Sequence, residues 1–277
     1  MQIFTTQNKL ISYLLPLREK YTIGFVPTMG ALHKGHLSLI KNSNEKCDIT
    51  ICSIFINPTQ FNNPSDLENY PKSLKKDLLL LKKTNCNIVY NPLISDLYPN
   101  GEKIKKFNFG SIANTMEGKY RPAHFDAMAT VVENFFNIIK PTKAFFGEKD
   151  LQQLQIVKIL INDMRSNVKI ISVPTVREKS GLAKSSRNKM LSRSDTQKAS
   201  HIYLCLTYCK KHKYKGIYNL KRYVRKEMQI QKIELEYIEM VNIKMMQPIE
   251  QWGKKNENAI CVAAYISGIR LIDNIIL

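Results

Sequence analysis

Two histidines separated by two residues are the first candidates for chemistry in this sequence. His33 and His36 enclose Lys34 and Gly35 in the stretch VPTMGALHKGHLSLI, residues 26–40. An apolar run ends in proline before them, and a helix is expected to begin around Gly35 or His36. Residues three apart on a helical turn share one side, and the backbone N–H groups at a helix start attract anions. The pattern therefore predicts a site in which two imidazoles bind a phosphate chain under attack.

The same stretch has a plainer interpretation, in which Gly30 and Gly35 only make a turn and the histidines are solvated. An isolated histidine would favour that interpretation. H-x-G-H directly after an apolar strand favours chemistry instead, because the glycine lets a ligand approach the backbone closely.

Three further polar clusters follow predicted strands. NPTQF at 57–61 presents Gln60, GEKD at 147–150 is followed by Gln153, and KSSR at 184–187 lies in a polar, glycine-containing loop. Each cluster alone could be a turn, a helix cap or a solvated basic loop. Together they predict a site with donors for phosphate and neutral amides for a second group.

Strands that alternate with helices position these clusters. Apolar, β-rich runs predict strands at 22–27, 48–56, 87–92, 142–147 and 168–174. Leu74, Leu78 and Leu81 predict an amphipathic helix between two of them. This alternation indicates an α/β fold, a Rossmann-like doubly wound parallel sheet with ligands beyond the carboxyl ends of its strands. We assign this domain to residues 1–175.

Residues 176–277 have a different character and predict a smaller C-terminal α+β domain. A polar loop containing KSSRN opens this part, and a helix is expected to begin near residue 195. Strand-like runs follow at 235–242, 259–266 and 269–277.

The composition bounds the class of protein. With 277 residues, 44% of them hydrophobic, the chain can form one large domain or two modest ones with real cores. No apolar run approaches the roughly 20 residues of a membrane-spanning helix, and the first residues lack the features of a signal peptide. We therefore expect a cytoplasmic protein with no membrane partner. Six scattered cysteines are expected to be buried, reduced thiols.

The strong positive charge leaves a second class of function open. Lysine and arginine outnumber acidic residues by 42 to 23, a net charge of +19. Such a charge could serve an RNA-binding protein that reuses a synthetase-like fold. However, the lysines are spread widely, and the densest cluster, KKHKYK at 210–215, has no interleaved aromatic platform. A positive field also suits a small polyanionic substrate.

Four segments in this order resemble the pantoate–β-alanine ligase (pantothenate synthetase) family, part of the nucleotidyltransferase-like group. They are PTMGALHKGH, SIFINPTQF, FGEKDLQQ and SSRN. The resemblance extends to ENYPKSLKKDL, EGKYRPAHF at 117–125 and RLIDN at 270–274, and so covers nearly the whole chain. H-x-G-H alone is shared by many adenylate-forming and cytidylyl-transferring enzymes, whereas the four segments together are close to diagnostic.

The resemblance implies roles for individual residues. Contacts to ATP are implied for Met29, Gly30, Ala31, Leu32, His33, Lys34, Gly35, His36, Gly147, Glu148, Lys149, Asp150, Val176, Lys184, Ser185, Ser186 and Arg187. Among these, His36 would be the proton donor, and His33, Lys149 and Arg187 would bind developing negative charge. Gln60 and Gln153 would hold pantoate, and Gln60 would also serve β-alanine.

The implied reaction condenses D-pantoate with β-alanine at the expense of MgATP, through a pantoyl adenylate, and releases AMP and pyrophosphate. This is the step that makes pantothenate (vitamin B5) for coenzyme A biosynthesis. The resemblance also implies a homodimer and gives no reason for a nucleic-acid partner. No magnesium ligand can be assigned: Asp77 is a candidate, but its place on a predicted helix favours a solvent-facing carboxylate.

Some positions depart from the family pattern. These are Lys184, where an apolar residue or proline is usual, Leu151, where an aromatic is usual, and Ala123 and Ala127, where glycines are common. Because the last two stand beside His124, we leave Arg121 and His124 outside the predicted site. Two further alternatives stay open, a nucleotidyltransferase that makes a dinucleotide cofactor and a degenerate, non-catalytic copy. The first gives no reason for the amides of Gln60 and Gln153.

Overall fold

The computed structural model describes all 277 residues and divides them into two compact units. Unit 1 comprises Met1–Phe109, Arg121–Glu148 and Ile156–Pro174, and unit 2 comprises Gly110–Tyr120, Lys149–Gln155 and Thr175–Leu277. The sequence analysis predicted a single domain boundary, after residue 175. The structure divides the chain between Pro174 and Thr175, and it also groups 110–120 and 149–155 with unit 2.

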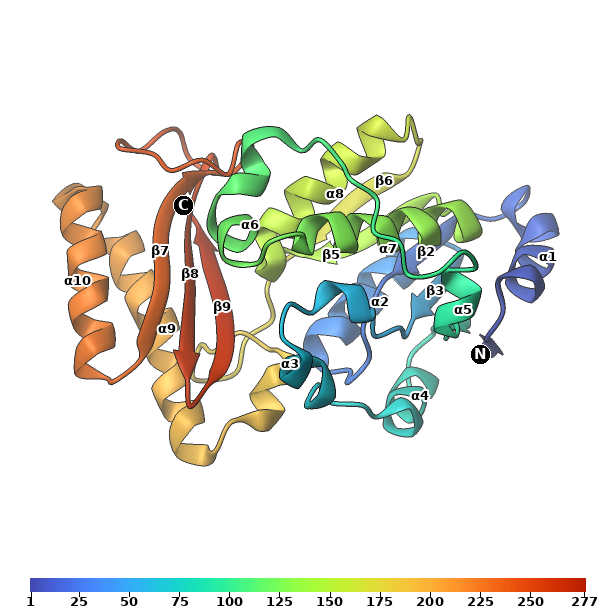
Figure 1. Ribbon diagram of the computed structural model, residues 1–277, viewed down its shortest axis with the longest axis horizontal. Helices are drawn as coiled ribbons and strands as arrows, with labels where there is room; N and C mark the ends of the chain where they lie inside the picture. Colours follow the sequence, from blue (N-terminus) through green and yellow to red (C-terminus); the bar gives the residue numbers. More distant parts are fainter. The chain divides into compact units, whose positions relative to one another are not determined.

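Unit 1 contains a six-stranded sheet in which every neighbouring pair is parallel (Figure 1). Its strands are β1 (Gln2–Phe4), β2 (Ile23–Val26), β3 (Ile49–Ser53), β4 (Ile88–Tyr90), β5 (Lys143–Gly147) and β6 (Lys169–Val173). They lie in the order β1-β4-β3-β2-β5-β6. The chain therefore winds outward from β2 through β3 and β4, and then returns to place β5 and β6 on the other side of β2.

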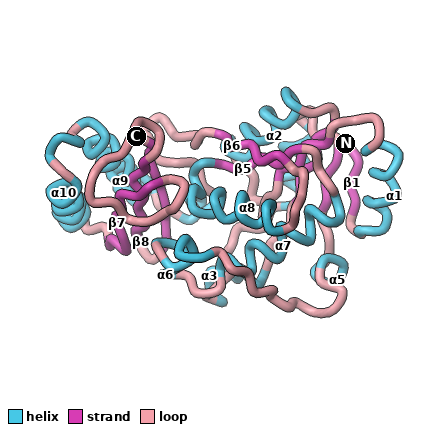
Figure 2. The backbone as a smooth tube through the Cα atoms, turned by 90° about the horizontal axis from the view of Figure 1, so that it is seen from above, coloured by secondary structure: helices cyan, strands magenta, loops and turns pink.

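Helices cover both faces of this sheet. They are α1 (Gln7–Arg18), α2 (Lys34–Lys46), α3 (Pro64–Glu68), α4 (Leu74–Lys82), α5 (Ile94–Leu97), α7 (His124–Ile139) and α8 (Leu151–Asp163), whose first residues belong to unit 2. Ile40 of α2 and Leu81 of α4 are buried in one cluster with Val26. Phe25, the strand neighbour of Val26, points to the opposite face and packs on Phe135 of α7, with ring centroids 5.5 Å apart. Figure 2 shows α2 and α7 on opposite sides of the strands, which confirms the doubly wound α/β prediction.

Unit 2 contains a three-stranded antiparallel sheet in the order β7-β8-β9. Its elements are α6 (Met116–Tyr120), α9 (Arg193–Lys211), α10 (Ile217–Ile230), β7 (Glu234–Asn242), β8 (Asn258–Ile266) and β9 (Ile269–Ile276). Leu206 of α9 and Val224 of α10 pack with Ile260 and Val262 on one face of the sheet. On the other face, Arg270 of β9 binds the carboxylate of Glu117 of α6 at 2.8 Å. The predicted smaller α+β domain is confirmed.

Several boundaries differ from the sequence predictions. The strand expected at 48–56 ends at Ser53, and β1 was not predicted. On α4, Leu81 is fully buried, whereas Leu74, the first residue of the helix, is 43% exposed and Asp77 takes the buried position one turn later. None of the helices has the length and apolar character needed to cross a lipid bilayer. All six cysteines are unpaired thiols, and five are buried.

Candidate active site

The loop after β2 and the start of α2 bring the two histidines together. Helix α2 begins at Lys34, and His33 caps it by accepting a hydrogen bond from the Gly35 N–H at its Nδ1 atom (3.1 Å). This bond leaves Nε2 as the protonated nitrogen of a neutral His33. The rings of His33 and His36 are stacked with their centroids 4.0 Å apart. Both residues are partly exposed, so the two imidazole rings are accessible at the end of a strand.

Asp77 of α4 binds the loop that precedes these histidines. Its Oδ2 atom accepts the Ala31 N–H and its Oδ1 atom accepts the Leu32 N–H, both at 2.8 Å. The Ser73 hydroxyl also donates to Oδ1 at 3.2 Å. Asp77 is only 1% exposed, so the prediction of a solvent-facing carboxylate was wrong. The amides of Ala31 and Leu32, which lie in the stretch assigned to ATP, are bonded to protein.

The course of this loop depends on two left-handed residues. Gly30 has φ +78° and Ala31 has φ +50°. A Cβ atom at Gly30 would lie 3.1 Å from the Asp77 carboxylate and 3.1 Å from the side chain of Ile54. Glycine is therefore needed here both for the backbone angle and for the approach of the carboxylate.

The turn after β3 carries Gln60 at the end of a short 3-10 helix, Pro58–Gln60. Asn57, which is 1% exposed, fixes the turn by donating to the Ala127 carbonyl at 3.3 Å and accepting the Tyr98 hydroxyl at 3.0 Å. Burial raises the pKa of Tyr98 to about 12, so the phenol remains a donor at neutral pH. Gln60 itself is partly exposed.

Arg121 and His124 hold the backbone of Gln60. Arg121 donates from Nη2 to the Gln60 carbonyl at 3.1 Å, and His124 Nδ1 lies 3.2 Å from the same oxygen. The two side chains also contact each other, with Arg121 Nη1 3.0 Å from His124 Nε2. The sequence analysis left both residues outside the site. The EGKYRPAHF segment was the available signal, because it belongs to the same family pattern as the Gln60 turn.

The sheet brings three of these loops to one edge. Strand β2 pairs in parallel with β3 on one side and with β5 on the other. The carboxyl ends of these strands lead into the His33 loop, the Gln60 turn and the Gly147–Glu148 segment, respectively. The winding of the sheet reverses between β2 and β5, which is where open α/β sheets bind ligands.

Lys149 is the first of the predicted site residues that belongs to unit 2, and Glu148 before it belongs to unit 1. The Lys149 ammonium lies 3.6 Å from the Asp150 carboxylate, and its side chain is 19% exposed. Asn274 of β9 donates to the Lys149 carbonyl at 2.9 Å and so fixes the backbone there.

The two neighbouring glutamines of α8 have different roles. Gln152 is 4% exposed, donates to the carbonyls of Ile112 and Thr115, and accepts the Glu117 N–H at 3.0 Å. Its amide is therefore committed to the 110–120 segment. Gln153 is partly exposed. Of the pair, Gln153 is the more exposed, and its role in binding pantoate stays a prediction.

Residues 176–184 form a hairpin. The Lys184 N–H donates to the Val176 carbonyl at 2.9 Å, which closes it. Arg177 anchors it by a double ion pair with Asp273 at 2.6 and 2.9 Å, and its guanidinium lies 4.1 Å from the centroid of the Tyr203 ring. Figure 1 shows this segment as it leads toward α9.

The KSSR residues follow the hairpin directly. Lys184 forms an ion pair with Glu178, so part of its charge is already neutralised. Ser185 caps the 3-10 helix Ser186–Met190 by accepting the Arg187 N–H, and Arg187 Nη1 lies 3.4 Å from the Arg270 carbonyl. Residues 184–187, to which the resemblance assigns contacts with ATP, thus lie in a segment that is hydrogen-bonded within unit 2.

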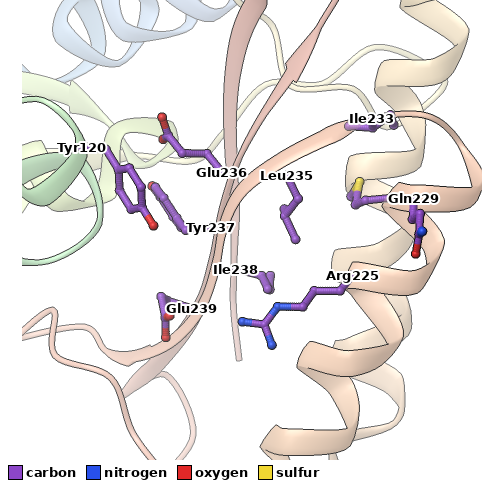
Figure 3. A pocket seen from close by; sticks show the side chains of 10 residues that line it. Tyr120, Arg225, Gln229, Ile233, Leu235, Glu236, Tyr237, Ile238 and Glu239 are labelled. Atoms are coloured by element: carbon purple, nitrogen blue, oxygen red, sulfur yellow. The ribbon is translucent and has the colours of Figure 1, made fainter.

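The predicted residues divide between the two units. Unit 1 carries those from Met29 to His36 together with Gln60, Gly147 and Glu148, and unit 2 carries those from Lys149 onward. No group of three or more His, Cys, Asp or Glu side chains is arranged to hold a metal ion. A cavity of about 350 Å³ lies beside β7 and α10, where Arg225 extends toward the strand (Figure 3). None of the predicted site residues lines it.

A parallel sheet whose winding reverses beside the strand that leads into H-x-G-H defines an open α/β protein with a ligand site at that point. The family model "Pantoate-beta-alanine ligase" matches residues 2–276 of this chain. The chain therefore belongs to the pantoate–β-alanine ligase family, a family of ATP-dependent ligases. The resemblance inferred from the four sequence segments is confirmed.

Individual relatives agree with this assignment. A pantothenate synthetase of Flavobacterium psychrophilum is 42% identical, over 99% of each chain. The crystal structure of pantothenate synthetase from Thermus thermophilus superposes with a TM-score of 0.92 at 32% identity, over 99% of each chain. The Francisella tularensis pantoate-beta-alanine ligase, complexed with beta-gamma ATP and beta-alanine, has a TM-score of 0.85 at 39% identity, over 100% of this chain and 97% of that one.

Proposed function

We propose that this chain joins pantoate to β-alanine in two steps, with ATP as the activating substrate. The observation that carries the proposal is the stacked His33–His36 pair at the carboxyl end of β2, beside the reversal point of the sheet. Family membership supports the choice of substrates, as does the complex of the Francisella enzyme with beta-gamma ATP and beta-alanine.

In the first step, a carboxylate oxygen of pantoate attacks the α-phosphorus of ATP. A new P–O bond forms, the bond between the α-phosphorus and its bridging oxygen to the β-phosphate breaks, and pyrophosphate leaves. His33 and His36 donate hydrogen bonds to the phosphate oxygens, with His36 as the proton donor. Lys149 and Arg187 add positive charge, and such fixed donors stabilise the charge that develops in the transition state.

Gln60 and Gln153 hold the pantoate. Their neutral amides can orient the acid without the strong pairing that an arginine would impose, so the carboxylate stays nucleophilic. The hydrogen bonds from Arg121 and His124 to the Gln60 carbonyl fix the backbone of this turn. Pro27, Met29 and Phe61 are partly exposed apolar residues suited to the geminal methyl groups of pantoate.

In the second step, the amine of β-alanine attacks the acyl carbon of the pantoyl adenylate. A C–N bond forms, the bond from the acyl carbon to the AMP oxygen breaks, and the nitrogen loses a proton. Gln60 also serves this amine substrate. Gly147, Glu148 and Asp150 position the nucleotide, Val176 lies against the adenine, and residues 184–187 bind the triphosphate.

Magnesium enters as part of the MgATP substrate. Mg²⁺ in such sites is usually held by phosphates and water with one or two carboxylates, rather than by an all-protein cage. Because both oxygens of Asp77 already accept hydrogen bonds, we assign no protein ligand to the ion. A homodimer is proposed from the family resemblance alone, and a cytoplasmic location is proposed as the sequence analysis expected it.

The direct test measures AMP and pyrophosphate with each substrate omitted in turn. We expect AMP formation to require ATP, D-pantoate and β-alanine together, and ATP–pyrophosphate exchange to require only ATP and D-pantoate. Release of ADP, or AMP formation independent of both acids, would refute the proposal. Dinucleotide formation from a mononucleotide and ATP would instead support the nucleotidyltransferase alternative.

A further inference from the structure

The hydrogen bonds of Asp77 connect α4 to the histidine-bearing loop across 45 and 46 positions of sequence. Both carboxylate oxygens point at backbone N–H groups, and each bond is 2.8 Å long. Hydrogen bonds to a charged acceptor are stronger than neutral ones. The contact therefore restrains the main chain immediately before His33.

The restrained segment depends on contacts from outside itself to keep its shape. Gly30 and Ala31 both have positive φ, and for alanine this region costs about 1–2 kcal/mol. Surrounding groups must offset this cost, and the Asp77 carboxylate contributes one bond to each of the Ala31 and Leu32 amides. Loss of that acceptor would be costly at buried donors, and Ala31 is 1% and Leu32 is 2% exposed.

The same geometry argues against a metal at Asp77. Its oxygens accept three hydrogen bonds, two from the loop and one from the Ser73 hydroxyl. The side chain is 1% exposed, and no second acidic or histidine ligand set surrounds it. A cation would have to displace the loop amides to reach the carboxylate.

We propose that Asp77 is a positioning residue, which sets the loop at 28–32 and thereby the placement of His33 and His36 against the substrate. It acts through the Ala31 and Leu32 amides and does not bind magnesium. The inference rests on the proposed function for its kinetic readout but not for its structural one.

The central variant is Asp77→Asn. An asparagine keeps one carbonyl oxygen and places an NH₂ group against the other amide, so one of the two bonds is lost. Ser73→Ala removes only the supporting hydroxyl. The matched control is Asp163→Asn, which makes the same chemical change at an exposed carboxylate at the end of α8.

The structural readout is hydrogen exchange of peptides that cover residues 27–36, measured without substrates. Loss of one bond should speed exchange of the Ala31 and Leu32 amides roughly tenfold in Asp77→Asn. Ser73→Ala should give a smaller increase, and Asp163→Asn none. Unchanged exchange in a folded Asp77→Asn protein would overturn the proposal. If Asp77→Asn does not fold, Ser73→Ala decides, and wild-type exchange in that variant overturns it.

The kinetic readout is ATP–pyrophosphate exchange at varied pantoate and magnesium. Displaced histidines should lower kcat roughly 10²-fold, while the KM for pantoate and the magnesium half-saturation stay within about twofold. Recovery of the Asp77→Asn rate at high magnesium would identify a metal ligand and overturn the proposal. If the wild-type protein shows no exchange reaction, the proposed function fails, and the hydrogen-exchange test of the loop still stands.

Discussion

A buried carboxylate holds the loop after β2 and another holds the hairpin at 176–184. The first binds backbone N–H groups, and the second binds a side chain. Asp77 accepts backbone N–H groups, so its hold on the main chain does not depend on the side chains of Ala31 and Leu32. Asp273 pairs with the guanidinium of Arg177, so it depends on the identity of one side chain. A loop held by its backbone keeps its side chains available to a ligand, and the stacked His33–His36 pair directly follows such a loop.

The largest effect on activity is expected when the imidazole of His36 is removed. His36→Ala should lower the rate of ATP–pyrophosphate exchange roughly 10²- to 10³-fold, because the proposed mechanism makes this imidazole a donor to the reacting phosphate. Since no backbone contact is lost, the unfolding midpoint in urea should stay close to that of the wild type. His201→Ala, at a partly exposed position on α9, is the control. An unaffected exchange rate would show that the proton donor is elsewhere.

The second effect concerns stability rather than chemistry. Arg177→Ala leaves the Asp273 carboxylate, whose side chain is 3% exposed, without its cation and should cost about 3–5 kcal/mol of unfolding free energy. Urea denaturation measures this loss, with Arg193→Ala at the exposed start of α9 as the control. A loss below about 1 kcal/mol would mean that the hairpin does not depend on this pair.

A smaller effect is expected at the end of the same hairpin. Lys184 is paired with Glu178, whose side chain is 40% exposed, so the lysine offers only part of its charge to a phosphate. Lys184→Met should raise the KM for ATP by less than about fivefold, the range of an exposed ion pair. Lys179→Met removes an exposed charge from the same hairpin and serves as the comparison. A far larger change would show that the Glu178 pair opens when ATP binds.

The smallest effect is a change in unfolding free energy at a position outside both loops. It measures what one left-handed alanine costs, for comparison with Ala31. Ala123 is the N-cap residue of α7 and has φ +60°, in the left-handed region that favours glycine. Ala123→Gly should therefore raise the unfolding free energy by about 0.5–1 kcal/mol, because relief of strain exceeds the added entropy of the unfolded chain. Chemical denaturation of the variant beside Ala127→Gly, at a buried helical position, separates relieved strain from a lost methyl group. A decrease at Ala123 would contradict this account.

The elements of the fold were predictable where local patterns were strong. Apolar runs marked β2 through β9, since a buried strand needs a continuous apolar segment. Strand β1 escaped prediction because it has three residues, two of them exposed. No local sequence pattern indicated that residues 110–120 group with unit 2. Their place depends on long-range contacts, with the Gln152 amide and through the ion pair between Glu117 and Arg270.

The candidate site shows the same division. Residues that form compact motifs, such as His33, His36 and Gln60, could be read from the chain. Asp77 could not, because its partners lie 45 and 46 positions away and the Leu74, Leu78 and Leu81 pattern predicted an apolar inward face without a carboxylate. Arg121 and His124 have partners 61 and 64 positions away. Motifs thus indicate the residues that are proposed to touch substrates, whereas the residues that hold their backbone are found only in the fold.

The adjacency of β2 and β5 also bears on how the protein is made. Thr142, just before β5, bonds to Ile23 of β2 across 119 positions of sequence. Strand β2 therefore has an unpaired edge until more than half of the chain has left the ribosome. Long-range parallel pairing is slow, and unpaired apolar edges invite aggregation. The strand that leads into the histidine loop therefore keeps an apolar, aggregation-prone edge through a long part of synthesis.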